Sequence, residues 1–181
     1  MTTNFLDLPE RQSSLARARV VILPVPYDGT TSFRSGARDG PRAIVDASRE
    51  LEDYDPELER DIAHVGIYTA PPLEPHMGGP KAMVKRVEAA VWRFAHGGKR
   101  VGLLGGEHSI TVGAVRAFHR LYPDLSVLYL DAHADLRDEY LGTPYSHACA
   151  ARRVTELCPL VQAGVRSLSQ EEHQFIREQG I

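Results

Sequence analysis

Two short segments of the sequence carry the residue types that bind metal ions in proteins. Residues 131–135 read DAHAD, and a second segment, GGEHS, supplies His108. In locally extended chain the side chains of Asp131, His133 and Asp135 would point to one side, because a strand repeats every two residues. The two glycines before His108 would let it approach closely. We therefore predict that these four side chains converge on a metal ion.

The chemistry of this ligand set favours a catalytic ion over a structural one. Imidazole and carboxylate ligands without thiolate suit Mn²⁺, Zn²⁺ or Fe²⁺ better than a structural zinc site, and carboxylates that match the imidazoles in number favour manganese. Each residue alone has an ordinary interpretation, since an Asp after a strand is often a helix cap and a single His is usually a surface or core residue. Only the combination predicts a metal centre.

Three further residues near these segments have candidate roles. His147, in the segment TPYSHAC, is predicted to be a proton shuttle beside a metal-bound water, because the pKa of an unperturbed imidazole lies near neutrality. Packing at the start of a helix is its alternative role. Glu107 is predicted to accept a hydrogen bond beside the ligating histidine. Cys149 has no obvious basic activator and is predicted to be a small buried residue rather than a nucleophile.

The elements that must position these residues are short apolar runs and amphipathic helices. The apolar runs, which are typical of parallel strands covered on both faces, are Arg19–Val25, Ala63–Tyr68, Arg100–Leu104, Ser126–Leu130 and Leu160–Val165. Helices are predicted over Arg42–Leu51 after Pro41, over Lys81–Ala95, and over Ile110–Leu121 with Ser109 as N-cap. This alternation predicts an α/β fold, a three-layer αβα domain with a mainly parallel sheet. Ligands bind such sheets at the carboxyl ends of the strands, where both segments lie.

Length and composition exclude several classes of protein. With 181 residues and a formal net charge of −3, the chain makes one domain and has no basic surface for nucleic acid or an anionic membrane. Two cysteines cannot form a disulfide framework, and no apolar run approaches the ~20 residues of a membrane span. The polar N-terminus lacks the apolar run of a signal peptide. We therefore expect a cytoplasmic protein with no nucleic-acid or membrane partner.

From about Val21 to its end, the sequence resembles the arginase/agmatinase (ureohydrolase) family, nearest to the agmatinase branch. The resemblance rests on PVPYD at residues 24–28, GARDGP at 36–41, GGEHS at 105–109 and DAHAD at 131–135. Members of this family hydrolyse a guanidinium group to urea and an amine with a pair of Mn²⁺ ions. The resemblance implies an arginase/deacetylase-like fold, a small guanidino substrate and a homo-oligomer.

The resemblance also implies a role for each candidate residue. His108, Asp131 and Asp135 would hold one ion. Asp131 would bridge to a second ion that His133 also binds, and Asp135 would additionally steady the bridging hydroxide. His147 matches the proton-shuttling histidine of the family, although this chain reads His-Ala-Cys where relatives often have His-Gly.

The family supplies two more metal ligands from a later Asp-x-Asp motif, and this sequence ends at Ile181 before such a motif. We therefore expect residues 1–181 to be a single ureohydrolase domain that is C-terminally incomplete, the N-terminal portion of an enzyme. Alone, the chain is expected to bind at most one ion weakly and to be nearly inactive.

The activity that the resemblance implies for the complete enzyme is hydrolysis of agmatine to putrescine and urea, a step of polyamine metabolism. Guanidinobutyrase, arginase and formimidoylglutamase share the metal motifs, so these activities are alternatives. A metal-deficient, non-catalytic relative is an alternative of another class, and a metal-dependent deacetylase is a weaker one.

Overall fold

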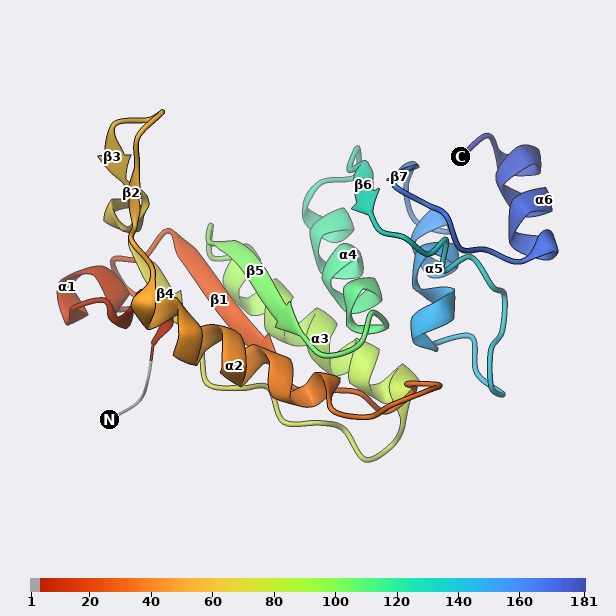
Figure 1. The fold of residues 1–181 in the computed structure, drawn as a ribbon, viewed down its shortest axis with the longest axis horizontal. Coiled ribbons are helices and arrows are strands. Elements are labelled where there is room, and N and C mark those ends of the chain that lie inside the picture. The colour runs from red at the N-terminus through yellow and green to blue at the C-terminus, as the bar shows by residue number, and fades with distance from the viewer. Residues whose placement is uncertain (1–3) are drawn as a thin grey trace. The chain divides into compact units, whose positions relative to one another are not determined.

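The computed structural model describes residues 4–181, whose ribbon is drawn in Figure 1. These residues form two compact units. The first unit holds the described residues up to Asp28 together with Ser35–Pro75 and Arg93–Gly106. The second unit holds Gly29–Arg34, His76–Trp92 and Glu107–Ile181. All four predicted metal ligands and His147 therefore belong to the second unit.

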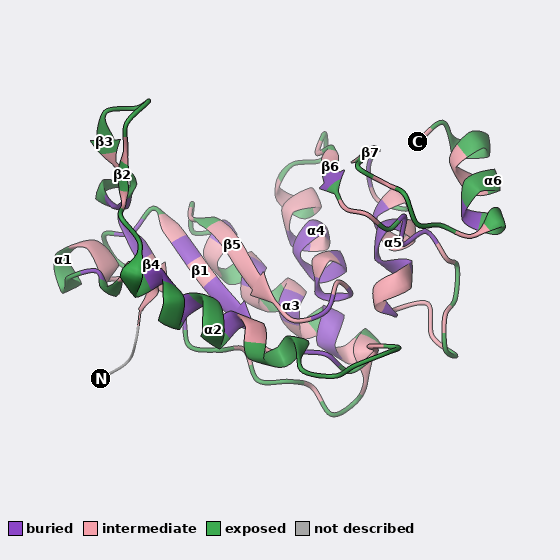
Figure 2. Ribbon diagram, in the orientation of Figure 1, coloured by how far each residue is buried: buried purple, intermediate pink, exposed green. Residues whose placement is uncertain are grey.

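A three-stranded parallel sheet forms the centre of the first unit. β1 (Val20–Val25) lies between β4 (Ile67–Thr69) and β5 (Arg100–Gly105), and it pairs with β5 along its whole length. The β-branched and other apolar side chains of β1 suit a central strand, and Val21 and Val25 are fully buried. Figure 2 shows buried stretches along β1.

The first unit also contains shorter elements that are not part of this sheet. α1 (Glu10–Ser13) is a single turn, and α2 (Gly40–Ala47) has Pro41 in its first turn, where the missing N–H costs no helical hydrogen bond. β2 (Tyr54–Asp55) and β3 (Arg60–Asp61) form a separate antiparallel pair.

The second unit contains a two-stranded parallel sheet and most of the helical residues. β6 (Val127–Leu130) pairs in parallel with β7 (Leu160–Ala163). α4 (Ile110–Leu121) precedes β6, α5 (Ala150–Thr155) precedes β7, and α6 (Gln170–Gln179) follows β7. α3 (Pro80–Ala95) begins in this unit, and its last turn belongs to the first unit.

Apolar packing in the second unit positions the loops that follow β6. The core contains Tyr129 of β6, Val154 of α5 and Leu160 of β7, together with Leu136 from the loop after β6. Because Leu136 is almost fully buried, it anchors the loop to the core directly after the DAHAD segment ends.

The predicted α/β class and its parallel strands are confirmed, while several predicted boundaries are wrong. α4 has the predicted bounds. The helix expected to reach Leu51 ends at Ala47 and continues only as a 3₁₀ turn. The strand expected from Ala63 begins at Ile67, because Ile62–Val65 form a 3₁₀ turn. β7 ends at Ala163 because Gly164 has a positive φ of 89°.

Two further expectations about these elements are also wrong. Ser109 does not cap α4, because its hydroxyl donates to the Glu107 carboxylate instead of accepting a backbone N–H. The β6–β7 pair is not covered on both faces, since Leu128, Leu130 and Val161 are 65%, 75% and 62% exposed. Within residues 4–181, no helix is both long and apolar enough to cross a membrane.

Candidate metal centre

The predicted ligands lie where β5 and β6 run into their following loops. His108 stands in the short connection from β5 to α4, and Asp131 directly follows the last residue of β6. The Asp131 N–H donates to the Ala163 carbonyl of β7, so the ladder between these strands extends to the first aspartate of the segment. Parallel strands thus deliver polar side chains at their carboxyl ends, as the α/β arrangement predicts.

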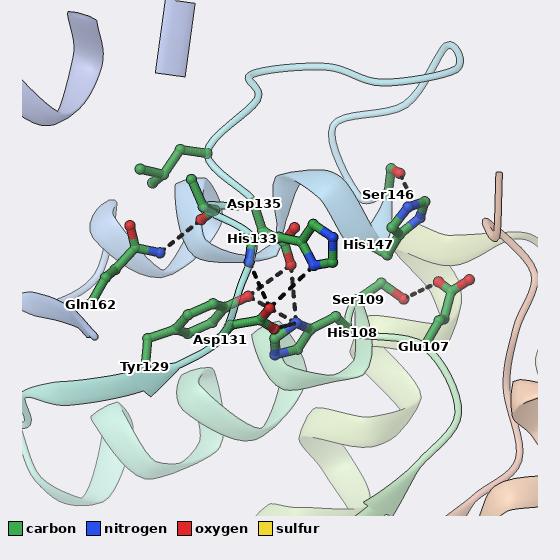
Figure 3. Close-up of polar contacts among 12 residues, drawn as sticks. Glu107, His108, Ser109, Tyr129, Asp131, His133, Asp135, Ser146, His147 and Gln162 are labelled. Atoms are coloured by element: carbon green, nitrogen blue, oxygen red, sulfur yellow. Dashed lines mark hydrogen bonds and ion pairs between the residues drawn. The ribbon is translucent and has the colours of Figure 1, made fainter. Parts of the chain in front are cut away.

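His108, Asp131 and Asp135 form one compact group, with a ligand atom from each residue lying within 4.8 Å of the others (Figure 3). His108 Nδ1 is 3.3 Å from Asp131 Oδ2 and 3.0 Å from Asp135 Oδ2. Two ligand atoms that each lie about 2.1 Å from one ion, at angles of about 90–110°, are about 3.0–3.4 Å apart. The three side chains therefore fit a shared divalent cation, whose charge would balance the two carboxylates.

Asp135 reaches this group by a backbone turn and not by strand alternation. Its φ is +51°, a left-handed conformation that Asp adopts more readily than most residues, and its carbonyl accepts the Arg152 N–H at the start of α5. The prediction that an extended segment aims all three side chains to one side is therefore wrong in its mechanism. The convergence of Asp131 with Asp135 nevertheless occurs.

His133 lies at the edge of the group rather than inside it. Its side chain is 65% exposed, and its Nδ1 is 3.2 Å from Asp131 Oδ1, the oxygen that does not face His108. Its backbone forms an isolated bridge with Ser167. The structure therefore brings His133 next to one carboxylate oxygen of Asp131, while His108 lies at the other.

Tyr129 is a site residue that the sequence interpretation missed. Its hydroxyl donates to Asp135 Oδ2 at 2.9 Å and lies 2.9 Å from His108 Nδ1, while its ring stacks on the His108 ring with centroids 4.8 Å apart. Burial, followed by the nearby Asp135 carboxylate, raises the pKa of the Tyr129 hydroxyl, so this group stays a neutral donor. Its position two residues before Asp131 on β6 is a signal that could have found it, because both side chains share one face of the strand.

The Asp131 carboxyl is kept ionised by its surroundings. Burial opposes ionisation, but the hydrogen bond from the His133 N–H and the nearby His108 and His133 imidazoles outweigh it, so the pKa of Asp131 is lowered. An ionised carboxylate at this position is what a metal ligand requires.

His147 and Glu107 lie beside the group in a separate hydrogen-bonded cluster. His147 Nδ1 is 3.3 Å from Thr30 Oγ1 and 3.3 Å from Ser146 Oγ. Glu107 is buried and accepts hydrogen bonds from Thr30 and Ser109; the predicted acceptor role is thus directed at these hydroxyls. Thr30 was not singled out in the sequence, because it lies 77 residues before Glu107 and 117 before His147.

Two other motif residues have structural roles. Cys149 is fully buried, and burial raises the pKa of its thiol to about 11, which agrees with an unreactive packing residue. Gly106 is required by the backbone of Tyr27, whose carbonyl oxygen would lie 2.0 Å from a Cβ at that position. This glycine is therefore explained by the close approach of two backbone segments of the same chain. The approach of His108 to an ion does not require it.

Comparison with known proteins gives this arrangement a family. The sequence model of the arginase family matches residues 18–181. The chain belongs to the arginase family. N(1)-aminopropylagmatine ureohydrolase of Synechocystis is 43% identical over an alignment of 180 residues, which covers 95% of this chain and 58% of that protein. Agmatinase of Halalkalibacterium halodurans is 34% identical over an alignment of 173 residues, which covers 94% of this chain and 60% of that protein.

Solved structures of arginase-family proteins have the same fold. The crystal structure of agmatine ureohydrolase of Thermoplasma volcanium matches with a TM-score of 0.86 and 33% identity, covering 96% of this chain and 58% of that one. The chain thus spans about three fifths of the length of the relatives it matches. The family resemblance that the motifs indicated is confirmed. Some of the relatives are named agmatinase and others N(1)-aminopropylagmatine ureohydrolase.

Proposed function

We propose that this chain carries the first part of the active site of a manganese-dependent ureohydrolase that acts on agmatine or on an aminopropyl derivative of agmatine. The products would be urea and the corresponding amine, which is putrescine in the case of agmatine. The observation that carries the proposal is the group formed by His108, Asp131 and Asp135 in a chain of the arginase family.

Each candidate residue has a role in this proposal. His108, Asp131 and Asp135 would hold one ion. Asp131 Oδ1, which accepts the His133 N–H and faces the exposed His133 ring, would serve a second ion together with His133 and with ligands from the rest of the complete protein. Manganese is proposed because aspartate oxygens and imidazole nitrogens, without thiolate, surround the position.

Hydrolysis of a guanidinium adds one water across a C–N bond and releases an amine that must gain a proton. The bound metal would lower the pKa of water from 15.7 to about 7, which supplies a nucleophile near neutral pH. The carboxylates of Asp131 and Asp135 would tolerate a cationic substrate. His147 would hold the proton that the leaving amine takes.

The proposed substrate class is supported by the names of the relatives, which refer to agmatine or to aminopropylagmatine. The proposal further takes the complete protein to be a cytoplasmic homo-oligomer that serves polyamine synthesis. Sedimentation of the complete protein as a monomer would contradict the assembly without affecting the chemistry.

Calorimetric titration of the 181-residue chain with Mn²⁺ tests the metal site. We expect one weak site, and we expect Asp135→Asn to remove it. Asp138→Asn is the matched control, because this carboxylate is 75% exposed, lies three residues away and pairs with Arg153. Two tight sites, or equal binding by both variants, would contradict the assignment.

Urea release tests the activity. The complete reading frame loaded with Mn²⁺ is expected to release urea from agmatine or N(1)-aminopropylagmatine, and the ratio of kcat/KM for the two substrates identifies the preferred one. Absence of urea from every guanidino compound, with the metal bound, would favour a non-catalytic relative.

A further inference from the structure

Glu107 is a buried carboxylate that stands next to the metal group but faces away from it into a cluster of hydroxyl groups. Its side chain accepts the Thr30 N–H at Oε2, and at Oε1 it accepts the hydroxyls of Thr30 (2.6 Å) and Ser109. The residue is only 6% exposed. Both of its oxygens therefore act as acceptors, and three donors surround them.

The hydrogen bond to Glu107 determines what Thr30 can offer to His147. A threonine hydroxyl has one hydrogen, and in Thr30 that hydrogen is directed at Glu107 Oε1. Toward His147, Thr30 Oγ1 can therefore act only as an acceptor. It accepts the backbone N–H of His147 at 3.0 Å and lies 3.3 Å from the ring nitrogen Nδ1 of the same residue.

The two neutral forms of the His147 ring are unequal in this environment. With hydrogen on Nδ1, the ring can donate to Thr30 Oγ1 and to Ser146 Oγ, which is also 3.3 Å away. With hydrogen on Nε2, the Nδ1 lone pair can accept from Ser146 but faces a lone pair of Thr30. The first form satisfies both contacts, and the second satisfies only one.

We propose that Glu107, acting through Thr30, is a positioning residue that keeps hydrogen on Nδ1 of His147 and leaves Nε2 as the nitrogen that takes up and releases protons. The catalytic meaning of this arrangement rests on the proposed function, in which His147 protonates the leaving amine. The hydrogen-bond arrangement itself does not. Figure 3 displays both halves of the cluster, with Glu107 beside Ser109 and His147 beside Ser146.

Nitrogen-15 NMR of the 181-residue chain tests the proposal directly. At a pH at which the His147 ring is observed to be neutral, two-bond and three-bond ¹H–¹⁵N correlations distinguish the protonated ring nitrogen from the unprotonated one. We expect the His147 ring to have a protonated Nδ1 and an unprotonated Nε2. A ring with hydrogen mainly on Nε2 would overturn the proposal in the wild-type chain, before any substitution is made.

Glu107→Gln tests whether the carboxylate is the cause. The amide oxygen must face the Thr30 N–H, so the amide NH₂ would donate to the Thr30 hydroxyl and free the hydroxyl hydrogen to turn toward His147 Nδ1. We expect the population of the Nε2-protonated form to rise. Glu139→Gln, an exposed position in the loop before His147, is the matched control and should leave the ring unchanged.

Thr30 offers a second route that does not alter Glu107. Thr30→Ser keeps the hydroxyl and should retain hydrogen on Nδ1, whereas Thr30→Val removes it, leaves Ser146 as donor, and should shift hydrogen to Nε2. Equal spectra from Thr30→Ser and Thr30→Val would refute the relay.

Activity of the complete enzyme separates this inference from the proposed function. If both hold, Glu107→Gln lowers kcat toward the loss of about 10²–10⁴-fold that removal of a general acid causes, with a smaller change in KM. If the NMR result holds and no guanidino substrate is cleaved, the positioning device stands and the proposed function fails. If urea is released but wild-type Nδ1 is unprotonated, the function stands and the positioning role fails.

Discussion

At the scale of single residues, Tyr129 connects the candidate metal ligands to the core through its hydroxyl group. This hydroxyl donates to Asp135, and Tyr129 is only 4% exposed. Removing the hydroxyl would leave the buried Oδ2 of Asp135 without this donor and loosen the ring that stacks on His108. Residues that orient metal ligands in this way typically change metal affinity by about 10–100-fold when they are substituted.

We therefore predict that Tyr129→Phe weakens Mn²⁺ binding about 10–100-fold and lowers the free energy of unfolding by about 1–2 kcal/mol. Calorimetric titration and urea denaturation measure the two effects. Tyr122→Phe is the control, because Tyr122 is 55% exposed and should change neither quantity. Wild-type metal affinity in Tyr129→Phe would show that Asp135 is oriented by its backbone alone.

The contact of α3 with α4 is the feature that matters most at the scale of elements. Gly113 is the fourth residue of α4, and glycine inside a helix is unfavourable by about 1 kcal/mol relative to alanine. A Cβ at this position would lie 2.5 Å from the Val84 carbonyl oxygen and 2.8 Å from the Val87 Cβ, both in α3. The glycine therefore allows two backbones to approach closely, and α4 begins two residues after His108.

Gly113→Ala is predicted to destabilise the chain despite its better helix propensity, because overpacking of this kind costs about 1–3 kcal/mol. Thermal unfolding followed by circular dichroism measures the change. Thr111→Ala, in the first turn of the same helix, changes propensity in the same direction without this close contact and should have little effect. A higher melting temperature for Gly113→Ala would mean that α3 can move away freely.

At the scale of the whole molecule, the ionisation of aspartate carboxyls makes the free energy of unfolding depend on pH. The chain has 24 acidic and 21 basic side chains, and three aspartates have lowered pKa values: Asp28, Asp131 and Asp138. The Arg38 guanidinium, together with the N–H groups of Gly36 and Arg38, lowers the pKa of Asp28 against its burial. Arg38 is 59% exposed, so solvent screens the charge part of this interaction.

The sign of the pH effect follows from the direction of these shifts. A carboxyl with a lower pKa in the folded state than its unfolded value of about 3.9 stabilises the fold above that pH, and the stabilisation is lost as pH falls through the folded pKa. We predict that the free energy of unfolding falls as pH decreases below about 4. Asp28→Asn should reduce stability by about 1–3 kcal/mol at neutral pH and flatten the acid dependence.

Urea denaturation at neutral pH and at about pH 3.5 measures this difference. Asp46→Asn is the control, because Asp46 pairs with the exposed Arg42 at 3.5 Å and its side chain is 52% exposed. An acid dependence that is the same in Asp28→Asn as in the wild type would exclude Asp28 as a source of the effect.

Local patterns in the sequence determined the class of fold and the place of the metal group. Uninterrupted apolar runs predicted the parallel strands, and the polar segments directly after two of these runs predicted the place of His108 and Asp131, because ligands bind α/β folds at the carboxyl ends of strands. This prediction was possible because strand, loop and ligand lie within a few residues of one another in the sequence.

Contacts between distant segments decided the rest. The positive φ of Asp135, the exposed place of His133 and the Tyr129 hydroxyl bond depend on how the loop after β6 packs on α5 and on His108. Thr30 meets Glu107 and His147 across 77 and 117 residues. No local pattern encodes these contacts, because side-chain partners far apart in sequence are chosen by the packing of the folded chain and by the need to satisfy buried polar groups.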